Sequence, residues 1–122
     1  MFHDYTELQL WKTSVDLTVK IYSATNHFPK SELFGLTSQL KRSSVSIASN
    51  IAEGAMRRGN KEFLHFLNIS YGSSAELHTQ LLIATRLGFL NQVIYAELSN
   101  HIEKIQRMNH NLHKKILATM KS

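Results

Sequence analysis

The sequence predicts an all-α fold: an antiparallel up-down four-helix bundle formed by a single domain, residues 1–122. Helix-breaking residues are scarce, with one proline and five glycines in 122 residues. Apolar residues recur at helical spacing along most of the chain, and no alternating strand pattern is sustained. Hydrophobic residues make up 43% of the chain and charged residues 19%. This composition is typical of a globular domain whose core needs no disulfide or metal.

Turn and capping residues divide the chain into four helical segments. The predicted helices cover approximately residues 6–26, 31–56, 60–87 and 91–120. Thr6, Asn60 and Asn91 are the expected N-caps. Gly88 is the expected C-cap of the third helix, and Pro29 lies just beyond the first. Connections of about three to six residues make consecutive helices antiparallel neighbours.

The first helix carries two apolar stripes on nearly opposite faces. One stripe comprises Leu8, Trp11, Val15, Val19 and Tyr22, and the other comprises Leu10, Leu17, Ile21 and Ala24. The third helix has a second apolar set as well, formed by Leu64, Tyr71, Ala75 and Leu82. A monomer rarely exposes a second apolar face, so Leu10, Leu17 and Ile21 are the predicted interface of a homo-oligomer. The alternative is that the first helix lies deep in its own fold.

The sequence contains no pattern that indicates catalysis. Glu62 and His65 have the Glu-x-x-His spacing of di-iron bundles, but the second copy of that motif is absent. His110 and His113 are spaced by three residues without a cysteine or a paired acid. No phosphate-binding glycine loop or nucleophile motif occurs. We therefore expect no enzyme activity, no metal and no cofactor. Asn109 falls within the apolar stripe of the fourth helix, where it either bonds a neighbour or fixes register.

Two groups of basic residues are candidate nucleic-acid contacts on a chain of formal charge +5. They are Arg57, Arg58 and Lys61 between the second and third helices, and Lys104, Arg107 and Lys114 on the fourth. Such groups bind RNA or DNA through counterion release without reading its sequence. Each can equally be a solvated face, and Glu53, Glu62 or Glu76 can pair with one of the arginines. A protein-interaction scaffold with no nucleic-acid role is therefore the competing interpretation.

The chain has no features of a secreted or membrane-spanning protein. It contains no cysteine, and the start of the chain lacks the basic and apolar regions of a secretory signal. The most apolar stretch, residues 63–84, is interrupted by His65, Glu76 and His78, so it is a poor membrane span. We expect a cytoplasmic protein.

Several motifs together resemble a known bacterial family. They are LWK at residues 10–12, FGLTSQLKR at 34–42, SIASNIAEG at 46–54, EFLHFL at 62–67, GSSAEL at 72–77 and LGFL at 87–90. The chain resembles the four-helix bundle proteins of 23S ribosomal RNA intervening sequences over nearly its whole length. That family is similar to the accessory protein of diversity-generating retroelements, a pentameric barrel that binds nucleic acid and a reverse transcriptase.

The resemblance implies a small cytoplasmic bundle that assembles into a homopentamer, with RNA, DNA or a partner protein as its ligand. The chain departs from the family at Ala48, where proline is common. Without proline, the second helix should run straighter. The motif residues Asn50, Glu53, Gly54 and Glu76 are interpreted as structural: Gly54 allows close helix approach, and the carboxylates are partners for Arg57 or Arg58.

Overall fold

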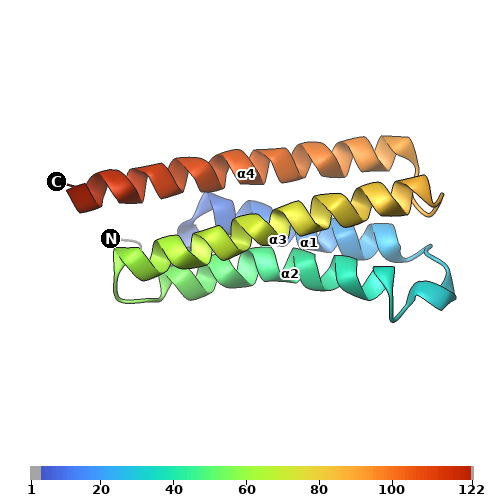
Figure 1. Cartoon of the computed structure of the whole chain (residues 1–122), viewed down its shortest axis with the longest axis horizontal. Coiled ribbons are helices and arrows are strands. Elements are labelled where there is room, and N and C mark those ends of the chain that lie inside the picture. Colours follow the sequence, from blue (N-terminus) through green and yellow to red (C-terminus); the bar gives the residue numbers. More distant parts are fainter. Residues whose placement is uncertain (1–3, 122) are drawn as a thin grey trace.

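Four long helices form the protein (Figure 1). The computed structural model describes residues 4–121; residues 1–3 and 122, which include part of the N-terminal sequence considered above, lie outside that range. The helices are α1 (Gln9–Thr25), α2 (Leu36–Ala55), α3 (Asn60–Arg86) and α4 (Gln92–Lys121), with 3₁₀ turns at Tyr5–Glu7 and Lys30–Glu32. The described range contains no strand, which confirms the all-α prediction. None of the helices in this range is both long and apolar enough to span a membrane.

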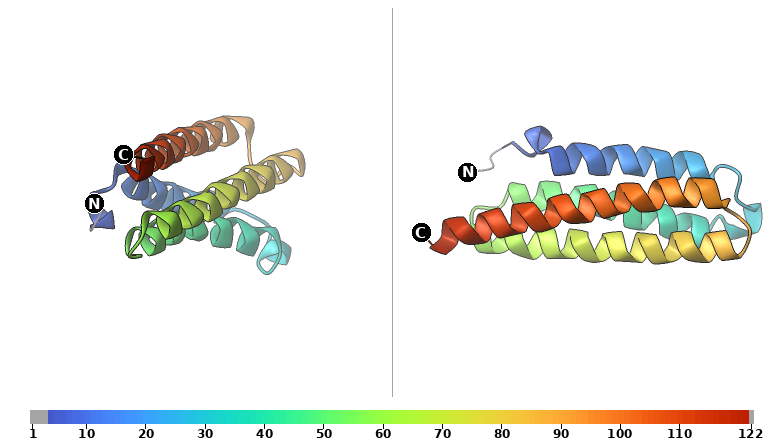
Figure 2. Two further views of the ribbon diagram at one scale, coloured as in Figure 1. Left: turned by 60° about the vertical axis from the view of Figure 1, so that its left-hand side comes forward. Right: turned by 90° about the horizontal axis from the view of Figure 1, so that it is seen from above.

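The helices pack side by side as an antiparallel bundle. Each contacts its two neighbours, in the cyclic order α1, α2, α3, α4, and α2 and α3 pack along the greatest length. Figure 2 shows α4 lying over the space between α1 and α3. The chain direction reverses at every connection, as the short linkers predict.

The first two helices begin later than their sequence predicts. Asp4, not Thr6, is the capping residue at the start: its carboxylate accepts a hydrogen bond from the Thr6 backbone N–H at 2.9 Å and caps a 3₁₀ turn. The helix α1 follows only from Gln9. Similarly, α2 begins at Leu36 instead of residue 31, and the Glu32 carboxylate accepts from the Leu36 N–H at 3.2 Å. In both places, short-range side-chain bonds stabilise a turn in place of another helical turn.

Gly88 terminates α3 as predicted. Its φ of 82° lies in the left-handed region that glycine adopts without steric cost. The Gly88 N–H donates to the Thr85 carbonyl at 3.0 Å, and the Phe89 N–H donates to the Ala84 carbonyl at 2.9 Å. These two bonds make a Schellman motif, which satisfies the last carbonyls of the helix and redirects the chain into α4.

The two predicted asparagine caps have different outcomes. Asn91 caps α4, because its side-chain oxygen accepts a hydrogen bond from the Ile94 N–H at 2.8 Å. Asn60 does not cap α3: it is the first residue of the helix, Gly59 holds the capping position, and the Asn60 side-chain oxygen has no hydrogen-bond partner among the described residues.

The face of α1 assigned to a subunit interface lies in the core of the chain itself. Leu17 and Ile21 are 0% exposed and Leu10 is 3% exposed. They pack in one apolar cluster with side chains from all four helices, among them Leu40, Ile51, Leu77 and Ile102. The interface prediction at Leu10, Leu17 and Ile21 is therefore corrected, because residues already covered by their own bundle have no surface to offer a second subunit.

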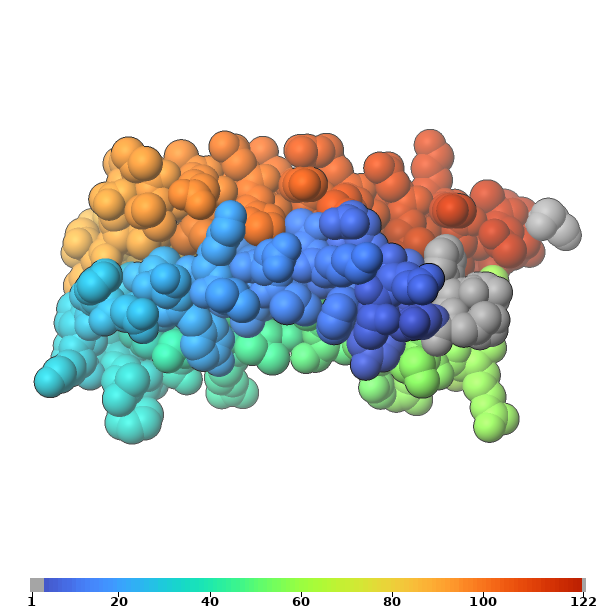
Figure 3. All heavy atoms as spheres, turned by 180° about the vertical axis from the view of Figure 1, so that it is seen from behind, coloured from blue at the N-terminus to red at the C-terminus, as the bar shows by residue number. Residues whose placement is uncertain are grey.

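The opposite stripe of α1 faces outward. Val19 is 65% exposed and Tyr22 is 44% exposed, whereas Leu8 and Trp11 pack partly against the core at the N-terminal end of the helix. Figure 3 shows this outer side of α1 as a continuous surface beside α4. The outer face of α1 is thus partly apolar, but it is formed by the stripe that contains Val19 and Tyr22 and not by the predicted interface residues.

Small residues let α2 and α3 approach closely. A Cβ on Gly54 would lie 2.7 Å from the Phe66 Cβ, closer than van der Waals contact permits. Further along, the Ser70 hydroxyl donates to the Ile47 carbonyl of α2 at 2.9 Å. The predicted role of Gly54 in close helix approach is confirmed.

The helix α2 runs without interruption through Ala48. In an α-helix the N–H of residue 48 donates to the carbonyl of residue 44, and proline would remove that bond. The Thr18 hydroxyl of α1 lies 3.0 Å from the Ser44 carbonyl and 3.1 Å from the Ser14 carbonyl of its own helix, so its single proton is shared between the two. The α1–α2 contact therefore places a shared donor at the carbonyl that a proline at position 48 would leave unpaired.

Candidate nucleic-acid interface

One end of the bundle brings together two segments that are far apart in sequence. The α2–α3 turn and the C-terminal end of α4 lie at the same end of the molecule, and α4 projects beyond the turn (Figures 1 and 2). Side chains of the turn also protrude there in the space-filling view (Figure 3). The turn that carries Arg57, Arg58 and Lys61 therefore lies at the same end of the bundle as the C-terminal part of α4, whereas Arg107 lies further back along α4, beside Tyr71 of α3.

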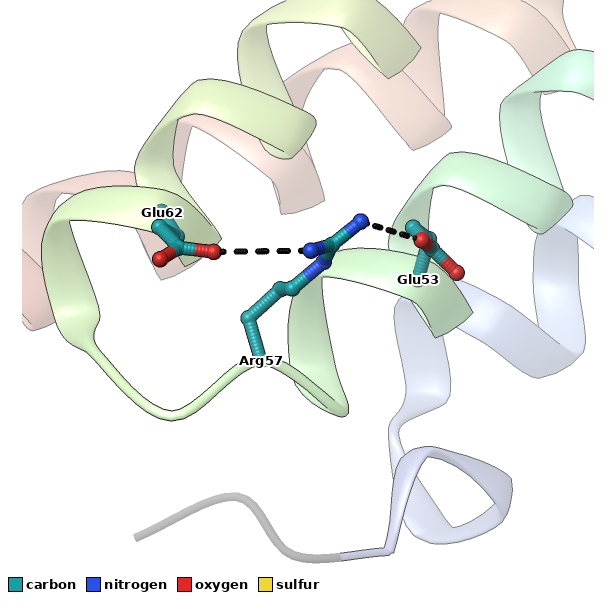
Figure 4. Close-up of polar contacts among 3 residues, drawn as sticks. All are labelled: Glu53, Arg57 and Glu62. Atoms are coloured by element: carbon teal, nitrogen blue, oxygen red, sulfur yellow. Dashed lines mark hydrogen bonds and ion pairs between the residues drawn. The ribbon is translucent and has the colours of Figure 1, made fainter.

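Arg57 is held by acidic and aromatic neighbours within the turn (Figure 4). Its guanidinium donates to the Glu53 carboxylate at 2.6 Å and lies 3.8 Å from the Glu62 carboxylate. It also lies over the Phe66 ring, 4.9 Å from the ring centre. Two carboxylates offset its single positive charge, so Arg57 holds the turn against α3 and is a poor phosphate contact. The expectation that a glutamate would pair with an arginine here is confirmed for Arg57.

Arg58 and Lys61 differ from Arg57 in their surroundings. Both side chains are exposed, and neither forms an ion pair with any residue between positions 4 and 121. The turn therefore presents two free cations. Free, solvated cations can exchange water and counterions for phosphate oxygens, whereas a paired arginine must first break its existing contacts.

On α4, the three predicted cations share one side of the helix. Lys104, Arg107 and Lys114 are spaced by three and seven residues, which brings them close to one line along the helix. All three are exposed, and none takes part in an ion pair within the described chain. Glu103 is the one acidic neighbour in this part of the helix, and it forms no ion pair with Arg107.

The formal charge of the protein is concentrated on this half of α4. Residues 104–121 contain five of the fourteen basic residues and none of the nine acidic ones. The remaining nine basic residues balance the nine acidic residues, so the whole net charge of +5 belongs to one stretch of helix. Part of this positive charge, notably that of Lys121, lies at the C-terminal end of α4, where it interacts favourably with the negative end of the helix dipole.

Sequence reasoning missed Tyr71, which was grouped with the apolar residues of α3. Its side chain is 45% exposed on the outer side of α3, beside the basic half of α4. It borders two surface hollows, of about 380 and 300 Å³. Arg107 lines the first hollow, and His110 lines both. One feature of the sequence could have pointed to Tyr71: it is an aromatic residue on a helix whose inward face is already occupied by leucine and phenylalanine side chains.

Two hydrogen bonds fix the register of α4 along α3 around Tyr71. The Gln106 amide donates to the Ser74 hydroxyl at 3.0 Å, and the Asn109 amide donates to the Leu67 carbonyl at 3.0 Å. Asn109 is buried, so its partner offsets the cost of burying an amide among apolar residues. Of the two roles considered for Asn109, bonding to a neighbour is confirmed.

The histidines do not gather into a metal site in the part of the chain described, residues 4–121. No three histidine or acidic side chains there are placed to hold one ion. His101 has a different role: its ring Nε2 hydrogen-bonds the Thr13 carbonyl at 3.2 Å, linking α4 to α1. Burial, together with nearby Lys20, lowers the pKa of His101 below its ordinary value.

Comparison with known proteins identifies the family. The family model of the 23S rRNA-intervening sequence proteins matches residues 6–111. The chain belongs to this family. A solved structure from Bacteroides thetaiotaomicron, described as a protein of unknown function from the S23 ribosomal protein family, has the same fold, with a TM-score of 0.77. It is 22% identical, and the match covers 86% of this chain and 98% of that one. No curated protein matches the sequence.

The motif residues of this family member have structural roles in the bundle. The Asn50 amide donates to the Ser46 carbonyl at 2.8 Å, Glu53 pairs with Arg57, and Gly54 permits the close approach of α3. Glu76 does not pair with an arginine; it lines a polar hollow between α2 and α3 that Arg42 also borders. Neither the family description nor that of the similar solved structure indicates a catalytic activity.

Proposed function

We propose that this protein binds RNA or DNA without sequence preference through the basic half of α4, extended by Arg58 and Lys61 at the adjoining turn. The observation that carries the proposal is the location of the charge: all of the net +5 lies on residues 104–121. The exposed, unpaired side chains of Lys104, Arg107 and Lys114 form its accessible part. Cations gathered on one surface release more counterions from a polyanion than the same charges spread over the molecule.

The family name supports a nucleic-acid partner only indirectly. It refers to intervening sequences of 23S rRNA and does not state what the proteins bind. Clustered positive charge attracts a polyanion whatever the family is called. We therefore expect binding that depends on charge and salt and is shared by unrelated sequences, because phosphate contacts carry no sequence information.

A triple charge reversal on α4 tests this proposal. We expect Lys104→Glu, Arg107→Glu and Lys114→Glu together to weaken binding to a generic RNA by at least about 10-fold at low salt. The slope of log affinity against log salt should also fall, by about 0.7 for each phosphate of a single strand that the variant no longer neutralises. Filter binding across a salt series measures both quantities, and circular dichroism checks that the variant is folded.

The matched control removes the same charge elsewhere. Lys12→Glu, Lys30→Glu and Arg86→Glu change three exposed basic residues outside the proposed surface. This control should retain most of the affinity. Equal losses in the two triple variants would show that only the total charge matters, and an unchanged α4 variant would remove α4 from the binding surface.

We propose self-association as part of the same function, as the family resemblance implies in the form of a homopentamer. The surface that supports it is the outer face of α1 and α2, where Val19 and Val45 are both exposed. They lie on adjoining helices, because the Thr18 hydroxyl bonds the Ser44 carbonyl and Lys41 lies over the Tyr22 ring.

Light scattering tests this surface. Val19→Lys combined with Val45→Lys should lower the measured mass from that of an oligomer to that of a single chain, since charged side chains oppose burial in an apolar contact. Val93→Lys, at an exposed valine on α4, is the matched control and should leave the mass unchanged. A wild-type protein that is already monomeric at micromolar concentration would end this part of the proposal.

The same apolar face favours a second candidate function, a scaffold that binds a partner protein and no nucleic acid. Binding of the wild-type protein to generic RNA at about 0.1–0.2 M salt distinguishes the two, because nonspecific electrostatic binding is already weakened there. Retention supports nucleic-acid binding, and its complete absence favours the scaffold.

A further inference from the structure

Tyr71 presents an aromatic ring that the fold does not use. It is 45% exposed, and its ring has no aromatic or cationic partner within residues 4–121. Tyr22, by contrast, carries Lys41 over its ring at 4.7 Å, and Phe34, which is 94% exposed, lies in the α1–α2 connection with no hollow beside it among those described here. A tyrosine ring has two apolar faces and a polar edge, so it suits ligands that are themselves planar.

The surroundings of Tyr71 combine charge with hydrogen-bonding groups. The larger hollow, about 380 Å³, is lined by Tyr71 together with Glu103, Gln106, Arg107, His110 and Asn111. The smaller, about 300 Å³, shares Tyr71 and His110 and adds Asn68, Asn109 and His113. Both volumes are near the lower end of the range for small-ligand sites, about 300–1,000 Å³. The two hollows are therefore neighbours that share Tyr71 and His110.

Hydrogen bonds between α3 and α4 hold the residues around Tyr71 in place. Tyr71 lies between Leu67 and Ser74 on α3, and both accept hydrogen bonds from α4, from Asn109 and Gln106 respectively. These contacts hold the α4 residues of the hollows at a fixed register beside the ring. A ring and polar groups built on two helices present a pre-formed surface, which reduces the entropy lost on binding.

We propose that Tyr71 and the two hollows beside it form a stacking site for an unpaired nucleobase, so that the nucleic acid bound by this protein is single-stranded. The proposal rests on the nucleic-acid binding proposed above and specifies its ligand. An exposed base stacks on the Tyr71 ring, Arg107 contacts the adjoining phosphate, and the amides and imidazoles around the ring meet the base edges. Bases within a duplex are covered on both faces by their neighbours and cannot stack this way.

Glu103, the acidic residue in the larger hollow, is compatible with a bound nucleobase and unfavourable to a bound phosphate. Glu103 lines the larger hollow with Arg107, and a carboxylate can accept a hydrogen bond from the amino group of a base. The same carboxylate repels a phosphate. The backbone of a bound strand therefore follows Arg107 and Lys114 along α4, while its base enters the hollow.

Two probes of equal length test the proposal: a single-stranded oligonucleotide carrying 2-aminopurine, and a blunt duplex of the same sequence. We expect the wild-type protein to bind the single strand more tightly and to quench its fluorescence, because stacking quenches 2-aminopurine. Tyr71→Ala should weaken single-strand binding by about 5- to 100-fold, the range of stacking on one aromatic residue. Duplex binding and the salt slope should stay unchanged, since the variant keeps every cation that meets a phosphate.

Two further substitutions at position 71 separate the effect of ring stacking from that of apolar bulk. Tyr71→Phe keeps the ring and should bind as the wild type does, whereas Tyr71→Leu keeps apolar bulk without the ring and should lose affinity and quenching. Phe34→Ala removes a 94%-exposed aromatic residue from the α1–α2 connection and should have no effect.

The outcomes distinguish the two proposals. If Tyr71→Ala binds like the wild type while the α4 charge variant loses binding, the stacking site is wrong and the basic surface stands. A wild-type preference for the duplex would also overturn the stacking site. If the wild-type protein binds neither probe at low salt, both proposals fail.

Discussion

Replacing Leu17 with alanine is expected to lower the free energy of unfolding by about 2–5 kcal/mol. The Leu17 side chain is 0% exposed, so its truncation removes apolar packing on every side and leaves a cavity that the surrounding helices fill only in part. The residue belongs to the face of α1 that the sequence alone assigns to a subunit interface. A large loss of stability is the expected result for a core residue of the bundle.

Lys12→Ala is the matched control, on the exposed side of the same helix. Lys12 is exposed and lies outside the surface proposed for self-association, so the substitution should change stability by no more than about 0.5 kcal/mol. Urea unfolding followed by circular dichroism at two protein concentrations measures both variants. A near-neutral Leu17→Ala, or a loss that appears only on dilution, would return Leu17 to a subunit interface.

The second prediction concerns Gly54, where α2 lies close against α3. A Cβ added there would lie 2.7 Å from the Phe66 Cβ and 3.0 Å from the Phe63 ring. The Phe66 Cβ is attached directly to the backbone, so rotating a side chain cannot relieve the contact. Overpacking of this kind costs about 1–3 kcal/mol, and the better helix propensity of alanine returns at most about 1 kcal/mol. Gly54→Ala should therefore be destabilising on balance.

Gly72→Ala should have the opposite effect on the free energy of unfolding. Gly72 also lies within a helix, but apart from its chain neighbours and the nearby backbone of α3, nothing in residues 4–121 lies within 4 Å of an added Cβ. Only the propensity gain of about 0.5–1 kcal/mol remains, so the variant should be more stable than the wild type. Thermal or urea unfolding of the two variants side by side gives the comparison. A stabilised Gly54→Ala would mean that α2 and α3 can move apart at little cost.

The helices were predictable because their signals are local, but the inward face of α1 was not. Periodicity identifies both apolar stripes of α1 and gives no reason to prefer one. The choice depends on the other three helices, and the inward face includes Thr13 and Ser14, which are polar by sequence. The Ser14 hydroxyl donates to the Leu10 carbonyl at 2.7 Å, so the serine can be buried without an unpaired group.

The basic site was partly predictable for the same reason. Glu53 and Arg57 are four residues apart on one helix, so their pairing follows from spacing alone. The role of the outer side of α3 was not predictable, because Tyr71 faces residues of α4 that lie 32 to 40 positions later in the chain. Their register depends on Gln106 and Asn109, whose partners on α3 are evident only from the packed structure.

The separation of charge along the chain gives the protein an electrical polarity. Residues up to position 103 are formally neutral, and the positive charge lies on the part of α4 that reaches the end of the bundle where the α2–α3 turn also lies. In the field of a polyanion, such a particle experiences a torque as well as an attraction, within about 10 Å at 0.1 M ionic strength. It should approach with this end foremost, while its neutral body points away and stays open to other molecules.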